Sequence, residues 1–314
     1  MEIPPDLSLQ GLLVGTSGYY YDDWVGIFNP PRIRAHYNAP RQSGNVSSQT
    51  DLLPLPDEER ADQDRLVFYQ RYFSFVEINN TFYREPAIEH FLDIERRSKP
   101  SMLYSVKTHK NLSHDSTGNM ELGRELMRKH VHAVSPLIET GRFYSFLIQL
   151  PDYAYRTTKQ LDYLLASAHE AVRMGAAVHI EFRHKSWHDV RVLQQLKDSG
   201  VGVCNTEIPL PEQGFPLKAY ATSDKGYIRY SGLNYAQWFP EQKPISARDK
   251  LAARNARYNY EYSDEELKER MKGQIALMNK TSVVAIAFNN HFQAKAVKNA
   301  IKNLKMLKEA LHNF

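Results

Sequence analysis

Two polar residues interrupt an otherwise apolar segment, FVEINNTFYR, at positions 75–84. Glu77 and Asn79 alternate with Val76 and Ile78, and such alternation is typical of a β-strand with one face against a core. A carboxylate in such a strand is costly unless it has a partner or a chemical role. Glu77 is therefore a candidate site residue, and a desolvated carboxylate suits general acid/base catalysis.

Other predicted strands carry polar side chains at equivalent positions near their ends. Glu181 and Arg183 alternate with Ile180 and Phe182 in the segment HIEFR. The same alternation adds Lys107, Gln149, Arg229 and Asn289 to this set. Because alternate residues of a barrel strand face the barrel axis, we expect these side chains to form a polar ring at the C-terminal mouth of a barrel.

The charged members of this ring are Glu77, Glu181, Lys107, Arg183 and Arg229, which sum to +3 − 2 = +1. A site with excess positive charge suits an anionic ligand. We predict an enzyme acting on an anionic, phosphorylated substrate, in which a glutamate is the acid/base and the cations hold the substrate's charge. The reaction could belong to a hydrolase, lyase or isomerase. Each charged pair could equally be a buried ion pair that fixes strand register.

The elements that must position this ring alternate along the 314 residues. Eight segments have the composition of strands: 12–18, 75–79, 102–107, 143–151, 177–183, 201–207, 226–232 and 283–290. Seven segments have a helical period: 60–73, 86–97, 119–140, 158–173, 189–199, 263–279 and 291–311. This order favours a closed (β/α)₈ TIM barrel over an open doubly wound sheet, and we predict a single domain over residues 1–314.

Two stretches interrupt the alternation. Residues 32–59 are polar and lack a period, which predicts a long insertion or loop after the first strand. Residues 232–262 are aromatic and basic, and follow the seventh strand. Both would lie at the C-terminal face of the barrel, where TIM barrels carry their sites.

The composition of the chain bears on whether it binds nucleic acid, crosses a membrane or holds a metal. The chain is 42% hydrophobic and 24% charged, with a formal net charge of +4, which is too mild to indicate nucleic-acid binding by itself. Cys204 is the single cysteine, and no signal peptide or membrane span is evident, so we expect a cytoplasmic protein without membrane contacts. With two inward carboxylates and no clustered histidines, we predict no metal and no cofactor.

Several segments together carry a family resemblance. GTSGYYYDDWVGIFNP, FVEINNTFYREP, SVKTHKNLSH, FLIQLP, HIEFRHKSW, YNYEYSDEEL and AFNNHFQAKAVKNA resemble, in this order, the sequence blocks of the YecE-like family, a domain of unknown function numbered seventy-two. The resemblance implies a (β/α)₈ barrel whose activity is not established. Its fold has been likened to endonuclease-IV-type barrels, which suggests nucleic acid as a partner.

The resemblance also implies a binding role for Asn79, which strand alternation already places on the inward side with Glu77. Outside the ring it implies the binding residues Ser17, Gly18, Tyr83, Trp187, Tyr258 and Asn290. Two functions stay open beside the enzyme. The same mouth could bind DNA or another nucleic acid, or the barrel could be a non-catalytic scaffold.

Overall fold

The structure is a computed structural model that describes residues 11–30, 64–114, 118–209, 212–238 and 246–312. The predicted insertion at 32–59 lies outside these residues. Within the described ranges, no helix combines the length and the apolar character needed to cross a membrane.

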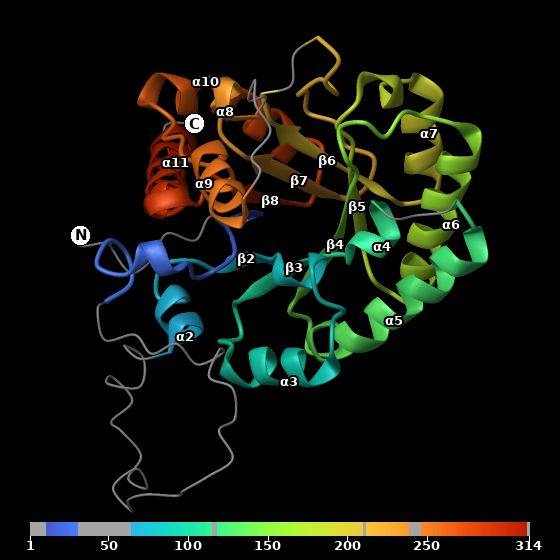
Figure 1. The fold of residues 1–314 in the computed structure, drawn as a ribbon, viewed down its shortest axis with the longest axis horizontal. Helices are drawn as coiled ribbons and strands as arrows, with labels where there is room; N and C mark the ends of the chain where they lie inside the picture. The colour runs from blue at the N-terminus through green and yellow to red at the C-terminus, as the bar shows by residue number, and fades with distance from the viewer. Residues whose placement is uncertain (1–10, 31–63, 115–117, 210–211, 239–245, 313–314) are drawn as a thin grey trace, which may run out of the picture.

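Eight parallel strands close into a barrel in the order β1-β2-β3-β4-β5-β6-β7-β8, which confirms the predicted (β/α)₈ fold (Figure 1). The strands are β1 (Leu12–Ser17), β2 (Phe75–Ile78), β3 (Leu103–Lys107), β4 (Phe143–Gln149), β5 (Val178–Glu181), β6 (Gly202–Glu207), β7 (Lys225–Tyr230) and β8 (Val283–Phe288). Each overlaps a segment that its composition predicts to be a strand. Because all strands are parallel, their carboxyl ends meet at one mouth of the barrel.

Helices follow seven of the eight strands, as their period predicts. They are α2 (Arg65–Tyr69), α3 (Ile88–Arg97), α5 (Met120–Glu139), α6 (Thr158–Arg173), α7 (Val190–Asp198), α10 (Asp264–Met278) and α11 (Lys295–His312). Figure 1 shows α5, α6 and α7 along one side of the barrel, with α10 and α11 on the opposite side.

The outer layer is thin beside β6. Among the described residues between Glu207 and Lys225, no helix or strand forms, and an isolated bridge joins Gly214 to His184. Strand β6 is also weakly joined to β5, because the two pair only through His179–Gly202 and Ile180–Val203. This part of the barrel wall is therefore covered by irregular chain in place of a helix and has the shortest strand pairing of the barrel.

The mouth segment 232–262 contains two helices that its aromatic and basic composition did not predict. They are α8 (Tyr235–Trp238) and α9 (Ala247–Arg257), and residues 239–245 between them lie outside the described part. Helix α9 begins with a capping box in which Ser246 and Asp249 exchange hydrogen bonds. This local signal marks its start.

Two separate cores explain which strand residues face the axis. The outward side chains Val76, Ile78, Phe146, Ile148, Ile180, Phe182, Ile286 and Phe288 are buried in the layer between barrel and helices. A second cluster fills the barrel interior, with Phe75, Tyr144, Leu147, Cys204, Tyr227, Ala285 and Ala287. The barrel is thus a packed core below its mouth, and the polar ring lies above it.

Candidate functional site

The centre of the polar ring is Arg229, which comes from β7 and is bound by carboxylates from two other strands. Its Nε and Nη2 donate to both Oε atoms of Glu77 at 2.9 to 3.1 Å. Its Nη1 donates to Oε2 of Glu181 at 3.0 Å. The two glutamates are 0% exposed and Arg229 is 2% exposed. The guanidinium therefore joins β2 to β5 across the barrel axis through a buried ion network.

Glu77 accepts two more hydrogen bonds. Ser17 Oγ donates to Oε1 at 2.8 Å, and Tyr227 OH donates to Oε2 at 2.6 Å. Burial and the Glu77 carboxylate raise the pKa of Tyr227 well above its ordinary value, so the phenol keeps its proton and continues to donate. With both carboxylate oxygens occupied by protein donors, Glu77 has little capacity left for a substrate.

A hydroxyl from helix α2 holds Ser17 next to Glu77. Tyr69 OH donates to Phe75 O at 2.9 Å and accepts from Thr16 N at 2.9 Å, so it bridges β2 and β1. Gly15 permits this close approach, because a Cβ there would lie 2.0 Å from Phe75 O. Gly15 and Thr16 of β1 thereby position the next residue, Ser17, which donates to Glu77.

Glu181 is surrounded by donors in the same way. Gln149 Nε2 donates to Oε1 at 2.8 Å, and Arg183 Nε donates to the same oxygen at 2.9 Å. Burial alone would raise the pKa of Glu181, but the Arg229 and Arg183 guanidiniums outweigh it and lower the pKa to about 2. At neutral pH this residue is a carboxylate that holds two arginines and an amide in place.

Lys107 completes the ring from the end of β3. Its Nζ donates to Gln149 Oε1 at 2.6 Å and lies 3.8 Å from the centroid of the Phe82 ring. Burial, followed by the nearby charges of Arg229 and Arg183, lowers the pKa of Lys107 to about 7. The side chain therefore changes its charge in the physiological pH range.

Arg183 is the ring's most accessible guanidinium, with a side chain 13% exposed. Its one hydrogen bond to the described residues runs from Nε to Glu181, so the other guanidinium donors remain for a ligand. Its Cζ lies 5.7 Å from the Trp238 ring, and Arg257 Cζ lies 5.1 Å from that ring. The mouth segment thus brings a second cation and an indole beside Arg183.

Several polar atoms around the mouth lack partners among the described residues although they are buried. They include Trp238 Nε1, Arg257 Nε, Asn79 Oδ1 and His291 Nδ1. Buried polar atoms in native proteins normally have a protein or water partner. These atoms are therefore candidates for contact with water or a ligand.

The structure brings together seven of the predicted site residues, Ser17, Glu77, Lys107, Gln149, Glu181, Arg183 and Arg229, in one hydrogen-bonded network. Four others lie around it. Gly18 N donates to Glu77 O at 2.7 Å with φ at +85°, and Asn289 Nδ2 donates to Ser231 Oγ at 3.1 Å. Asn79 follows β2 directly, and the Tyr258 ring contacts Trp238 and His291.

Three predicted binding residues are not in this network. Trp187 is fully buried, stacks on Phe182 in the outer core and donates to Ala154 O at 2.7 Å. Asn290 donates to Asn299 Oδ1 of α11 at 2.8 Å, which anchors that helix. Tyr83 is 68% exposed. The contacts of Trp187 and Asn290 are those of residues that stabilise the packing of the fold.

Two further groups of residues lie beside the ring although they are not among the predicted site residues. Tyr227 lies two residues before Arg229 on β7, so strand alternation alone could have placed it inside the barrel. Tyr21 stacks on His291 with ring centroids 4.1 Å apart, across a long separation in sequence that no local pattern reveals. Burial lowers the pKa of His291 to about 3, so this imidazole is neutral.

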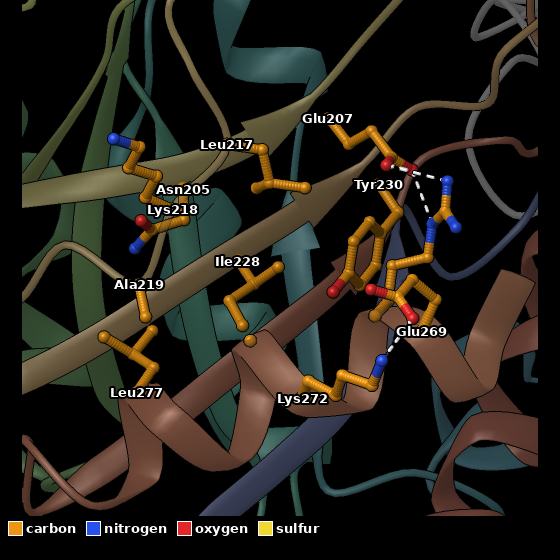
Figure 2. Close-up of a pocket in the computed structure, with 12 residues that line it drawn as sticks. Asn205, Glu207, Leu217, Lys218, Ala219, Ile228, Tyr230, Glu269, Lys272 and Leu277 are labelled. Atoms are coloured by element: carbon orange, nitrogen blue, oxygen red, sulfur yellow. Dashed lines mark hydrogen bonds and ion pairs between the residues drawn. The ribbon is translucent and has the colours of Figure 1, made fainter.

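A separate cavity of about 330 Å³ lies outside the barrel, beside the connection after β6 whose described residues form no helix (Figure 2). Leu217, Ile228 and Leu277 form an apolar side of this cavity, with Ile228 on β7 and Leu277 on α10 (Figure 2). Glu207 and Arg270 form an ion pair with an Nη2–Oε1 distance of 2.9 Å at its edge. This cavity shares no residue with the polar ring.

No group of three or more His, Cys, Asp or Glu side chains in the described part of the chain could hold a metal ion. The metal-free site thus stays a prediction. Cys204 is free and buried inside the barrel, and burial raises the pKa of its thiol well above the ordinary value. A thiol in this state is a poor nucleophile.

The fold and the ring define a TIM-barrel protein with its charged site at the carboxyl ends of the strands. The chain belongs to the family described as "Protein of unknown function DUF72", whose sequence profile matches residues 48–314. The resemblance found in the sequence blocks is thereby confirmed.

Known relatives agree with this assignment. The UPF0759 protein YunF of Bacillus subtilis (strain 168) is 23% identical over 256 residues, which cover 79% of this chain and 88% of that protein. A DUF72 family protein from Thermotoga maritima MSB8 has a solved structure with a TM-score of 0.71 and 25% identity, covering 95% of this chain and 99% of that one. A DUF72 family protein from Enterococcus faecalis V583 gives a TM-score of 0.69 at 21% identity, covering 79% and 89%.

Proposed function

We propose that this protein is an enzyme that binds a small phosphorylated substrate at the C-terminal mouth of its barrel. The observation that carries the proposal is the arrangement of Arg183 and Lys107 on the two sides of the Gln149–Glu181 pair. Both cations are held by the ring and keep donors that the described residues do not use. Bidentate guanidinium donors match the geometry of a phosphate group.

The charge of the ring supports an anion rather than a cation. With Lys107 protonated, three cations face two carboxylates, which gives +3 − 2 = +1. Glu77 pairs with Arg229 and Glu181 is shared by Arg229 and Arg183, so the excess charge lies at protonated Lys107, which has no carboxylate partner among the described residues. A positive site with low-dielectric walls attracts anions more strongly than the same charges in water.

The geometry favours a division of roles that differs from the expected one. Glu77 and Glu181 were expected to act as acid/base, but both accept several protein donors and the pKa of Glu181 is lowered to about 2. A general acid/base works best with a pKa near the operating pH. We therefore assign proton transfer to Lys107 and assign the two glutamates to holding the cations.

Substitution of Arg183 tests the anion site. Arg183→Gln should weaken the binding of inorganic phosphate about 10- to 100-fold, because hydrogen bonds to a charged group contribute about 1.5 to 3 kcal/mol. Isothermal titration calorimetry measures this affinity. The matched control is Arg191→Gln on the exposed surface of α7, which should bind phosphate like the wild type. Equal affinity in wild type and Arg183→Gln would refute the site.

Nucleic-acid binding at the same mouth is the second candidate function. The observation that favours it is the proximity of the Arg183 and Arg257 guanidiniums to the Trp238 ring, since aromatic and cationic side chains together can bind the bases and backbone of a single strand. The alternative of a non-catalytic scaffold predicts neither ligand.

Salt dependence separates these functions. We expect oligonucleotide binding to be weak and to fall with a slope of log K against log salt of about −3, as for roughly four phosphate contacts. Phosphate binding in the buried ring should depend much less on salt. Fluorescence anisotropy and calorimetry between low and physiological salt measure the two slopes. Submicromolar oligonucleotide binding at physiological salt, lost in Arg183→Gln, would make nucleic acid the leading function.

A further inference from the structure

Lys107 differs from the other charged members of the ring in its partners. Arg229 and Arg183 each have a carboxylate at ion-pair distance. No described carboxylate lies at that distance from Lys107 Nζ, although Lys107 is only 9% exposed. Buried lysines are almost always paired, so an unpaired one needs an explanation. An ion pair that fixes strand register does not explain this residue.

The described contacts of Lys107 use one of its N–H groups, whether the amine is neutral or protonated. One N–H is donated to Gln149 Oε1, and the Phe82 face lies beside the nitrogen. Gln149 cannot turn its amide, since its Nε2 is held by Glu181. No described donor reaches the nitrogen, so the lone pair of the neutral amine stays unoccupied. An amine with a free lone pair is a nucleophile.

We propose that Lys107 is the amine nucleophile of this site and forms a Schiff base with a small phosphorylated aldehyde or ketone. This inference rests on the proposed function, because Arg183 would bind the phosphate while the carbonyl carbon meets Lys107. Desolvated lysines beside another cation are a known route to such nucleophiles. Here burial and two guanidiniums keep much of the Lys107 population unprotonated at neutral pH.

The covalent step needs no further reagent. The Lys107 nitrogen forms a bond to the carbonyl carbon, and the electron pair of the C=O π bond moves to oxygen, which takes a proton while the nitrogen releases one to water. The nitrogen lone pair of this carbinolamine then forms the C=N π bond as the C–O bond breaks, and the oxygen leaves as water with a proton from solvent or from the substrate phosphate. The resulting protonated imine is in equilibrium with the neutral imine through release of its N–H proton to solvent. The net reaction joins amine and carbonyl into C=N with loss of one water.

Reductive trapping tests the proposal on the whole chain. Protein is mixed with glyceraldehyde 3-phosphate at pH 7.5 and reduced with borohydride, which delivers hydride to the imine carbon and leaves a stable secondary amine. Intact mass and peptide mapping then locate the adduct. We expect about one adduct per chain at Lys107, at least 10-fold more than with unphosphorylated glyceraldehyde, and competition by inorganic phosphate.

Two controls separate this inference from the proposed function. Lys107→Arg keeps a cation in the ring and should lose the specific adduct, which assigns the labelled amine. Phosphate affinity is measured by calorimetry on the same wild-type preparation. If phosphate binds and Lys107 carries no adduct, the nucleophile is refuted and the anion site stands. If phosphate does not bind but both aldehydes label Lys107, the proposed substrate class is refuted and the reactive amine stands.

The pH dependence gives a further criterion on wild-type protein. The groups that face Lys107 are Gln149, Phe82, and the charges of Arg183, Arg229, Glu181 and Glu77. Labelling of Lys107 should rise through pH 7 and then level off, whereas ordinary surface lysines gain reactivity up to about pH 10. If the labelling of Lys107 has the same pH dependence as that of the surface lysines, the proposal is overturned.

Discussion

Replacing Arg229 with methionine is expected to lower the free energy of unfolding by about 3 to 5 kcal/mol, the usual cost of removing one partner from a buried ion network. The guanidinium donates to Glu77 and Glu181, which are both 0% exposed. Without Arg229, two carboxylates remain buried in the barrel with fewer donors. Denaturant unfolding at pH 7, followed by circular dichroism, measures the change.

Two variants make this expectation specific. Arg183→Met removes one hydrogen bond from a partly exposed guanidinium, so it should cost no more than about 2 kcal/mol. Adding Glu77→Gln to Arg229→Met removes an unpaired charge, so the double variant should recover at least about 1 kcal/mol. If Arg229→Met unfolds within about 1 kcal/mol of the wild type, the network is hydrated rather than dry.

The second large effect concerns Lys107 and pH. The difference in unfolding free energy between wild type and Lys107→Met should change by roughly 3 kcal/mol from pH 6 to pH 9.5, in favour of the wild type as pH rises. The sign follows from the pKa of about 7 in the folded state against an ordinary value of 10.5. Between these values the unfolded chain binds more protons than the folded one, so raising the pH stabilises the wild type relative to the variant.

Denaturant unfolding of the wild type and of Lys107→Met across this pH range measures the difference. The contributions of all other titrating groups are common to both proteins and cancel in the difference. The causes of the shift are burial, then Arg229 and Arg183, opposed by Glu181 and Glu77. The control is Lys129→Met, since Lys129 is exposed and its pKa is raised by Glu125, which gives no such trend. A constant difference between wild type and Lys107→Met would mean that Lys107 keeps its ordinary pKa.

Strand alternation predicted the orientation of the ring because it is a local property. Glu77 lies between Val76 and Ile78, and a parallel barrel gives these two faces different environments. The same argument places Lys107, Glu181 and Arg229 inside, as the hydrogen bonds confirm. The eight strands and seven helices were predictable for the same reason.

Partner choice was not predictable, because it depends on distances between strands far apart in sequence. Nothing in the sequence says that Arg229 takes both glutamates and that Lys107 receives only an amide oxygen. The orientation of Trp187 depends on tertiary packing against Phe182. Tyr144 breaks the alternation, since a register shift between β3 and β4 turns it into the barrel interior.

The described residues that follow β6 form no helix, and this affects the expected dynamics of the barrel wall. Strand β6 pairs with β5 through two residue pairs, and a cavity lies beside the outer face of β6 and β7. Regions with few packing contacts open locally at a lower free energy than the global unfolding transition. The amide protons of β6 should therefore exchange with solvent earlier than those of the better-packed strands. The neighbouring strand β5 ends at Glu181, which accepts a hydrogen bond from Arg229. Local opening of β6 would therefore weaken this ion pair. The opening equilibrium would then depend on the protonation of the charged side chains in the polar ring.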